Sequence, residues 1–184
     1  MPVIVVGGSN KNVGKTSLIC GIIRAFPELR WTAVKITSHR YGQIEPVWEE
    51  HAITGRQGGQ ASDTSRFLRA GAHRSFLVTA SESVLPWREM EAVLRGSRLL
   101  IYESTRIAKE LRADIRLAVM SGTETGFKLS FVPFLNEADA VIASPTTDVM
   151  LPKNRSAIPV FRLSSPNEIP QELTEWLRGH LFSG

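Results

Sequence analysis

The sequence predicts an α/β protein with a mostly parallel central sheet and helices on both of its faces. Short β-branched runs alternate along the chain with segments of helical periodicity, which is the rhythm of strands joined by crossover helices. Most connections between these segments are short enough for one compact fold. The chain has 184 residues, so we expect residues 1–184 to form a single domain.

The first half of the chain contains five expected elements. "PVIVV" (2–6) is a β-branched strand, and "LICGIIRAF" continues an apolar helical pattern over 15–26. "WTAVKIT" (31–37) is the next strand. A helix over 62–72 then begins at Ser-Asp, residue types that cap helix N-termini, and "SFLVTA" (75–80) follows as a strand.

The second half continues the alternation. "RLLIYE", "DIRLAVM", "AVIAS" and "IPVFRL" have the length and composition of strands. An amphipathic pattern near the end of the sequence predicts a last helix. The expected elements are strand 98–103, helix 105–111, strand 114–120, helix 131–138, strand 140–144, strand 158–163 and helix 169–182.

Two connections are longer or more polar than the others. Residues 38–61 read "SHRYGQIEPVWEEHAITGRQGGQA", and long loops of this kind are often functional. Residues 121–130, "SGTETGFKLS", form a second candidate for a mobile loop.

Composition limits the class of protein. The net charge of +4 comes from arginines scattered among acids, which weakly favours an anionic ligand and gives no sign of a nucleic-acid arm. Cys20 is the only cysteine and is expected to be a buried residue in a reducing compartment. We found neither a leader peptide nor an apolar run long enough to cross a bilayer, so we expect a cytoplasmic protein without a membrane segment.

The stretch "GGSNKNVGKTS" (7–17) has the setting of a phosphate-binding P-loop, because it joins a strand to an apolar helix. In such a loop, backbone N–H groups and the helix N-terminus surround the phosphates. Lys15 reaches the β- and γ-phosphates, and the hydroxyl of Thr16 ligates Mg²⁺. This predicts the three-layer fold of P-loop NTPases, with a nucleotide triphosphate held by Ser9, Asn10, Lys11, Asn12, Val13, Gly14, Lys15, Thr16 and Ser17.

Ser9 departs from the pattern GxxxxGK[ST], whose first position is glycine. Gly7 and Gly8 precede it and can supply the freedom for a tight exit from the strand. Gly14 is expected to let the backbone approach a phosphate closely. Lys11 either senses a phosphate or is solvated.

A nucleotide hydrolase also needs a carboxylate near the metal. Glu103 ends a buried-looking strand, and ligands in open α/β sheets sit at the carboxyl ends of strands. We therefore expect Lys15 and Glu103 to be catalytic, although Glu103 would also favour the start of a following helix. Ser62 or Asp63 could cap the helix, and capping does not exclude metal contact by Asp63. The predicted metal ligands are therefore Thr16, Glu103 and Asp63.

Other side chains are weaker candidates. Lys35, Thr37 and His39 alternate along a strand end and so point the same way, toward phosphate or a partner. For Arg66 and Arg69, which share a helix face, exposure to solvent is the favoured interpretation. The guanine-selecting Asn-Lys-x-Asp pattern is absent, and base contacts are expected from the segment 144–154, including Asp148.

Together, "SNKNVGKTSL", "AVKITSH", "SDTSRFLRAGAHRSFLVT" and "LLIYES" resemble the molybdopterin-guanine dinucleotide biosynthesis protein B (MobB) family of P-loop proteins. The similarity covers roughly residues 1–105, with a looser echo at "ADAVIASPTTDV" and "IPVFRL". The helix "DTSRFLRAGA" followed by a strand is its most discriminating part.

The resemblance implies a GTP-binding protein with Mg²⁺ that hydrolyses GTP slowly and assists attachment of a guanine nucleotide to molybdopterin, often as a dimer. By position, the family's nucleotide loop matches Gly14, Lys15 and Thr16, its basic strand end matches Lys35 and His39, and its acids match Asp63 and Glu103. The sequence departs from the family at "YES", which lacks the glycine of a Val-Glu-Gly motif. It departs again at "RYGQIEPVWEEHAITGRQGGQ", which replaces a shorter Asp-rich stretch.

Two functions of different classes fit these residues. The first is an accessory GTP-binding module whose partner is a molybdenum cofactor nucleotidyltransferase or a molybdoenzyme. The second is an enzyme that uses ATP, either a small-molecule kinase or an ATP-dependent ligase, with residues 38–61 forming the acceptor pocket. A nucleic-acid binder would need a concentrated basic face with stacking aromatics, which the sequence does not clearly show.

Overall fold

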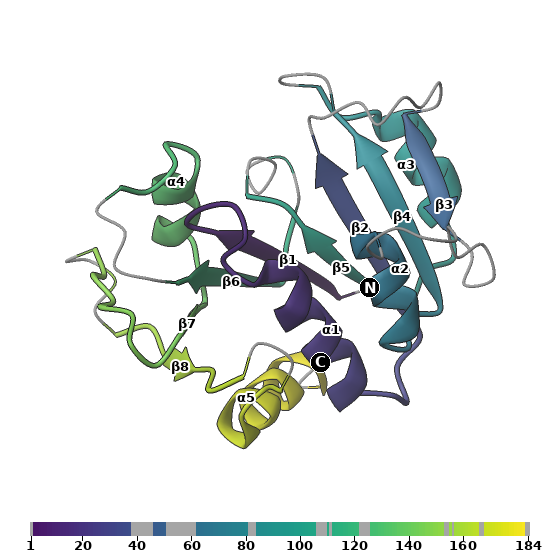
Figure 1. Cartoon of the computed structure of the whole chain (residues 1–184). Coiled ribbons are helices and arrows are strands. Elements are labelled where there is room, and N and C mark those ends of the chain that lie inside the picture. Colours follow the sequence, from purple (N-terminus) through teal and green to yellow (C-terminus); the bar gives the residue numbers. More distant parts are fainter. Residues whose placement is uncertain are drawn as a thin grey trace.

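A twisted sheet runs through the middle of the molecule (Figure 1). The computed structural model describes residues 2–37, 46–50, 62–80, 84–105, 110, 112–121, 126–152, 155, 157–165 and 168–182. Within these residues the strands are β1 (Val3–Gly8), β2 (Trp31–Thr37), β3 (Val47–Glu50), β4 (Arg74–Thr79), β5 (Leu99–Glu103), β6 (Ile115–Met120), β7 (Ala140–Ala143) and β8 (Val160–Arg162).

The strands are ordered β3-β4-β2-β5-β1-β6-β7-β8. All neighbours are parallel except β3, which pairs antiparallel with β4 at one edge. Because β1 lies between β5 and β6, the loop that follows β1 opens near the centre of the carboxyl edge, where α/β proteins bind ligands.

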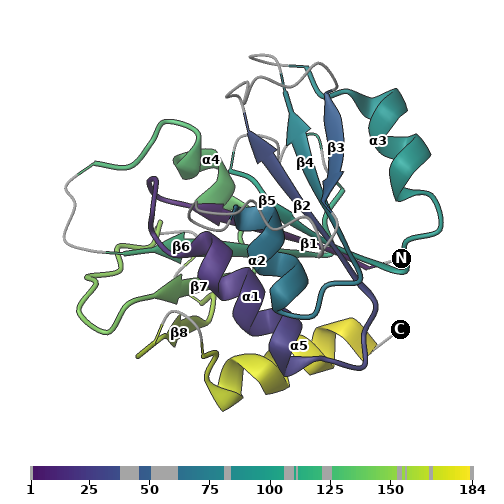
Figure 2. The same ribbon diagram turned by 45° about the vertical axis from the view of Figure 1, so that its right-hand side comes forward.

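Helices cover both faces, which confirms the expected three-layer α/β architecture. They are α1 (Lys15–Ala25), α2 (Asp63–Arg69), α3 (Trp87–Leu94), α4 (Phe131–Asn136) and α5 (Gln171–Phe182). Alternate residues of β1 face opposite layers, as strand geometry requires. Ile4 packs with the core side chains of α1, α2 and α5, whereas Val5 packs with those of α3 and α4. Figures 1 and 2 show α1 and α2 side by side on the first of these faces.

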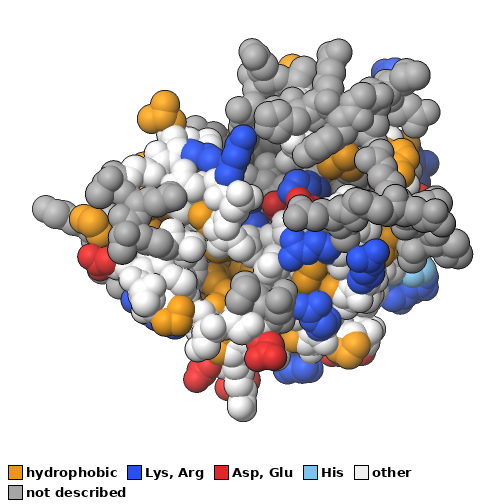
Figure 3. Space-filling view, viewed as in Figure 1, with side chains coloured by type: hydrophobic (Ala, Val, Ile, Leu, Met, Phe, Trp, Pro, Cys, Tyr) orange, Lys and Arg blue, Asp and Glu red, His pale blue; other side chains and the backbone are white. Residues whose placement is uncertain are grey.

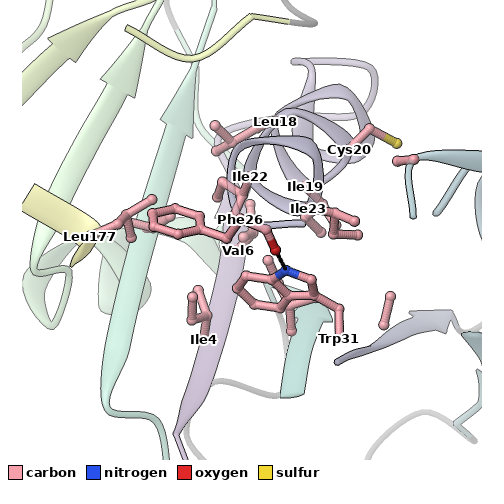
Figure 4. Close-up of a cluster of buried hydrophobic side chains, with 14 of the residues drawn as sticks. Ile4, Val6, Leu18, Ile19, Cys20, Ile22, Ile23, Phe26, Trp31 and Leu177 are labelled. Carbon is pink, nitrogen blue, oxygen red and sulfur yellow. Dashed lines mark hydrogen bonds between the residues drawn. The ribbon is translucent and has the colours of Figure 1, made fainter. Parts of the chain in front are cut away.

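The core under α1 fixes the start of the phosphate loop (Figure 4). Ile4 and Val6 of β1 are fully buried against apolar side chains of α1. Trp31, also fully buried, donates from Nε1 to the backbone oxygen of Phe26 at 3.1 Å, the dashed line in Figure 4. This bond ties the C-terminal end of α1 to the beginning of β2. The helix is therefore anchored at the end that lies away from the loop.

Most expected elements are present within one or two residues of their predicted bounds, but two elements were not expected. Val47–Glu50 was assigned to a long loop and is in fact the edge strand β3. The helix α3 was also missed. The expected helix 105–111 and the rest of the segment 38–61, including His39, lie largely or wholly outside the described residues.

No helix among the described residues combines the length and the apolar character needed to cross a membrane.

Candidate functional site

The phosphate loop leaves the carboxyl end of β1 and enters α1 at Lys15. Two of its residues adopt the left-handed conformation: Asn12 has φ 61° and Gly14 has φ 98°. Asparagine and glycine are the residue types that best tolerate it. A Cβ on Gly14 would meet no described atom within 4 Å, so in this structure the positive φ, rather than crowding, is what requires glycine there.

Ser9 fits the loop because its backbone does not take a positive φ. Its N–H bonds the oxygen of Val119 at 2.9 Å, and its own oxygen accepts from Lys128 N at 3.1 Å. Gly7 and Gly8 do not supply the conformational freedom we expected, since neither has a positive φ. They supply space instead.

The two glycines at the end of β1 are crowded from different sides. A Cβ on Gly7 would lie 2.6 Å from the ring of Phe134. A Cβ on Gly8 would lie 2.6 Å from Val13 and 2.9 Å from Cδ of Lys15. The loop is therefore folded tightly over the strand end, and the stem of Lys15 passes across Gly8.

The ammonium of Lys15 is held by the loop itself, because Nζ donates to the backbone oxygen of Asn10 at 3.1 Å. Burial lowers the pKa of Lys15, while the nearby charge of Glu103 acts in the opposite direction. A partly desolvated ammonium gains strongly from a new anionic partner. The loop thus holds a partly desolvated ammonium at the cleft through a carbonyl contact.

A charged network joins the start of α1 to the ends of β2 and β5. The hydroxyl of Thr16 donates to Oε2 of Glu103 at 2.7 Å. Lys35 donates to Oε1 of the same carboxylate at 3.1 Å and also pairs with Asp63. The structure thus brings together four residues that lie far apart in sequence, as the carboxyl-edge argument predicted for Glu103.

Burial disfavours the charged forms of both Lys35 and Asp63, but the opposite charges around each group outweigh this effect. Burial lowers the pKa of Lys35, yet the charges of Glu103 and Asp63 raise it above its ordinary value overall. Burial raises the pKa of Asp63, yet the hydrogen bond and the charge of Lys35 bring it below its ordinary value overall. Both groups therefore stay charged near neutral pH.

Arg66 is not the free surface side chain that we expected. Its guanidinium donates to Ser17 Oγ at 2.9 Å and pairs with Asp63 at 3.4 Å. It therefore links α2 to the first turn of α1. Ser62 caps α2 by accepting from Ser65 N, as expected, so Asp63 is left to serve the network.

These groups border a cleft of about 740 Å³ at the carboxyl edge. Acidic and basic side chains lie together near the middle of this face in Figure 3. Lys35 and Thr37 both line the cleft, and so does Ile36 between them. The described residues around it include the loop residues Lys11, Asn12, Gly14, Lys15, Thr16 and Ser17.

Lys128 and Thr105 are two of the cleft residues that sequence reasoning missed. Lys128 lines it from the segment that we expected to be a mobile loop, and burial and the charge of Lys11 lower its pKa. The same segment is fastened to the phosphate loop, because Asn10 donates to the oxygen of Gly126 at 3.1 Å. Thr105, which accepts from Gly8 N at 3.0 Å, is the second. No periodic signal marks either residue.

A second pocket of about 280 Å³ adjoins the loop on the other side. Asn12, Val13 and Gly14 form one wall. The remaining described lining comes from the ends of β6 and β7 and from the segment after β8, namely Val119, Met120, Ser121, Ile142, Ala143, Ser144, Pro145, Leu163 and Ser164. The expected base segment thus contributes Ser144 and Pro145, whereas Asp148 is exposed and is not among the lining residues.

The donor set near Thr16 suits a magnesium ion. Mg²⁺ binds one or two carboxylates together with hydroxyl, phosphate and water oxygens. Thr16, Glu103 and Asp63 offer such oxygens in one network, with Lys35 between the two carboxylates. Among the described residues, no three His, Cys, Asp or Glu side chains are grouped so that they could hold a metal ion together.

Comparison with known proteins identifies the fold. Neither the protein-family models nor the curated protein sequences include a match to this chain. Among solved structures, a MobB protein homologue from Bacillus stearothermophilus is 18% identical with a TM-score of 0.56, and the match covers 100% of each chain. HypB from Helicobacter pylori, solved in complex with nickel, is 16% identical with a TM-score of 0.60, over 98% of this chain and 87% of that one.

LpxK from Aquifex aeolicus, solved with ATP, is 16% identical with a TM-score of 0.53. That match covers 88% of this chain but only 53% of LpxK. Identities this low show the fold alone. The chain has the MobB-like fold of P-loop NTPases, as the phosphate-loop pattern and the sequence resemblance predicted.

Proposed function

We propose that this chain is a Mg²⁺-dependent GTP-binding protein that hydrolyses GTP slowly and acts as an accessory protein in attaching a guanine nucleotide to the molybdenum cofactor. The observation that carries the proposal is the joining of the phosphate loop to two carboxylates through Thr16 and Lys35. The sequence resemblance to the MobB family and the full-length structural match to a MobB homologue support the same assignment.

Each residue has a defined task in this proposal. Lys15 transfers its hydrogen bond from Asn10 to the β- and γ-phosphate oxygens. A Mg²⁺ ion held by Thr16 and the carboxylates would supply positive charge against the charge that develops on the phosphates. Glu103, buried and 5% exposed, orients the attacking water once Thr16 has turned toward the metal. Lys35 keeps the charges of Glu103 and Asp63 balanced.

Slow turnover follows from the position of Arg66. An arginine that reaches the transferring phosphate accelerates hydrolysis by orders of magnitude. Arg66 lines the cleft, but it is held by Ser17 and Asp63. It therefore acts as a brace in the proposed resting state, and a partner protein would supply further acceleration.

The base would lie in the pocket of about 280 Å³ beside Asn12, where serine hydroxyls and strand-end backbone groups are available. Guanine preference rests on the family resemblance. The proposed partners are a molybdenum cofactor nucleotidyltransferase or a molybdoenzyme in the cytoplasm, with this chain acting as a homodimer. The second candidate, a small-molecule kinase or ATP-dependent ligase, is favoured by the structural match to LpxK, which was solved with ATP.

Base preference and turnover distinguish these candidates. We would measure affinity and steady-state hydrolysis for GTP and ATP side by side, each with and without Mg²⁺. Tighter GTP binding with slow, Mg²⁺-dependent hydrolysis supports the GTP-binding protein. Rapid ATP consumption that requires an added metabolite would instead establish the kinase or ligase, and the absence of binding by either nucleotide would overturn both.

A further inference from the structure

A separate basic cavity lies at the amino ends of the parallel strands, whereas the phosphate loop lies at their carboxyl ends. It measures about 210 Å³ and is lined by residues at the amino ends of three parallel strands. Arg30 precedes β2, Arg74 begins β4, and Arg98 precedes β5. Blue and pale-blue side chains lie together at the right-hand edge of Figure 3, on the side where β4 begins in Figure 1.

Arg74 forms a fixed wall of this cavity. Its guanidinium makes two hydrogen bonds to the carboxylate of Glu49, at 2.7 and 3.1 Å, and a third to the oxygen of Val93 at 2.7 Å. It also lies 4.6 Å from the ring centroid of Phe76. Because three hydrogen bonds hold Arg74 and its charge is paired with Glu49, it organises the cavity and leaves most of the ligand binding to its neighbours.

Arg30 and His73 form the next wall. Arg30 donates from NH2 to Nε2 of His73 at 2.6 Å. Because an arginine only donates, Nε2 is the acceptor in this contact. The remaining guanidinium donors of Arg30 are available to a ligand.

Arg95 and Arg98 come from the turn between α3 and β5, which Gly96 makes possible with φ 84°. Both are exposed. The described residues that line the cavity carry four guanidinium groups and no carboxylate, and Glu49 outside it balances only Arg74. Like charges gathered in a concave site repel one another unless an anion joins them.

We propose that this cavity binds a small, multiply charged oxyanion of the phosphate class, with Arg95, Arg98 and Arg30 as the binding residues. Guanidinium groups match phosphate oxygens in pairs of parallel hydrogen bonds. The hydroxyl of Ser97 also lines the cavity, and its buried oxygen has no hydrogen-bond partner among the described residues. A concave site without an aromatic side chain in its described lining fits a small anion better than a nucleic-acid strand, which binds through stacking.

The site is tested by titrating isotope-labelled protein with pyrophosphate at constant ionic strength and following backbone amide NMR shifts. We expect saturable shifts at residues 73–74 and 95–98, separate from those of the phosphate loop. Replacing Arg95 and Arg98 together by glutamine should weaken binding at this cavity at least tenfold and leave the shifts of the loop unchanged. Arg88→Gln, on the exposed side of α3, removes one charge outside the cavity and should have no effect.

A second titration with GDP, in Lys15→Ala protein, identifies the source of the phosphate. Shifts at 95–98 with GDP as well as pyrophosphate indicate the phosphates of a nucleotide, whereas shifts with pyrophosphate alone indicate a free anion. Three outcomes would overturn the proposal. They are shifts that do not saturate, a loss of pyrophosphate affinity in Arg88→Gln equal to that in the double variant, and tighter binding of single-stranded RNA than of pyrophosphate. The proposal does not depend on the function of the phosphate loop, because the two sets of amides report separately.

Discussion

Thr16 and Glu103, 87 residues apart in sequence, are joined by a 2.7 Å hydrogen bond from the threonine hydroxyl to Oε2. The bond holds the first turn of α1 against the end of β5. The same hydroxyl is the group that a P-loop offers to Mg²⁺. Loading the site would therefore exchange one hydrogen bond for a metal contact and release one oxygen of a buried carboxylate.

Glu103→Gln should separate turnover from binding. The amide keeps the size of the side chain but removes the charge, and Lys35 keeps Asp63 as its partner. We expect Mg²⁺-dependent hydrolysis to fall at least tenfold, equal to about 1.4 kcal/mol on the barrier, with nucleotide affinity changed much less. Steady-state hydrolysis beside a binding titration measures both, and unchanged turnover would move the catalytic role to another carboxylate.

Lys15→Ala should leave the fold intact and abolish tight triphosphate binding. The substitution removes one hydrogen bond to a loop carbonyl, which is a small loss for the folded protein. It also removes the ammonium expected at the β/γ-phosphates. Fluorescent-nucleotide affinity and thermal melting report the two effects, with Arg69→Ala on exposed α2 surface as the matched control. Equal affinity in all three proteins would refute the phosphate-loop assignment.

Ser9→Gly should change nucleotide affinity by less than about threefold, because Ser9 does not need the left-handed backbone that glycine favours. Gly8→Ala should have the larger effect. Its new Cβ would press on the stem of Lys15, so we expect at least a tenfold loss of affinity and a stability loss of about 1–3 kcal/mol. Isothermal titration and urea unfolding compare the two variants. A larger loss of affinity in Ser9→Gly than in Gly8→Ala would contradict this account of the loop.

Asp63→Asn should destabilise the protein in a pH-dependent way. The folded-state pKa of Asp63 lies below its ordinary value of 3.8, so its stabilising contribution is present above pH 3.8 and is lost as the pH falls through the folded-state value. Because the pair is partly exposed, we expect a difference of about 1 kcal/mol at pH 7. Urea unfolding of both proteins from pH 7 to pH 3 should show the difference shrinking; a constant difference would argue against the ion pair.

Ser164→Trp should distinguish base binding from phosphate binding. Ser164 is exposed on the rim of the pocket beside Asn12, so a large side chain there fills the proposed base site with little strain on the core. We expect GTP affinity to fall at least tenfold and tripolyphosphate affinity to stay the same. An equal loss of GTP affinity and tripolyphosphate affinity would mean that the base binds elsewhere or that the substitution disturbs the loop.

The sequence predicted the features that depend on local pattern. The phosphate loop, α1 and the parallel strands are each marked by nearby residues, and Glu103 could be placed because parallel strands end at one edge. The edge strand β3 is only four residues long, and its pairing with β4 is set by tertiary contact rather than by its own periodicity. The helix α3 has an apolar face, with Met90 fully buried and Val93 and Leu94 partly buried, but it is only eight residues long and its pattern was not recognised.

The contacts of long polar side chains were the least predictable part of the site. The position of Arg66 on α2 was foreseeable, but its bonds to Ser17 and Asp63 depend on how closely α1 and α2 pack. Lys128 belongs to an irregular segment, so nothing local indicates that it lines the cleft. Cavities also arise from several segments at once, which is why the arginine cavity was recognised only in three dimensions.

The central place of β1 has a consequence for how the protein folds. Although β1 is made first, its two sheet neighbours are β5 and β6, which end at Glu103 and Met120. During synthesis, β1, which supports the phosphate loop, therefore has both neighbouring strands only after more than half of the chain has been made. Such distant pairings slow folding and delay ligand binding until late in translation. Nascent chains halted before residue 99 should therefore not bind nucleotide. Chains extended beyond residue 120 and clear of the ribosome should begin to bind it.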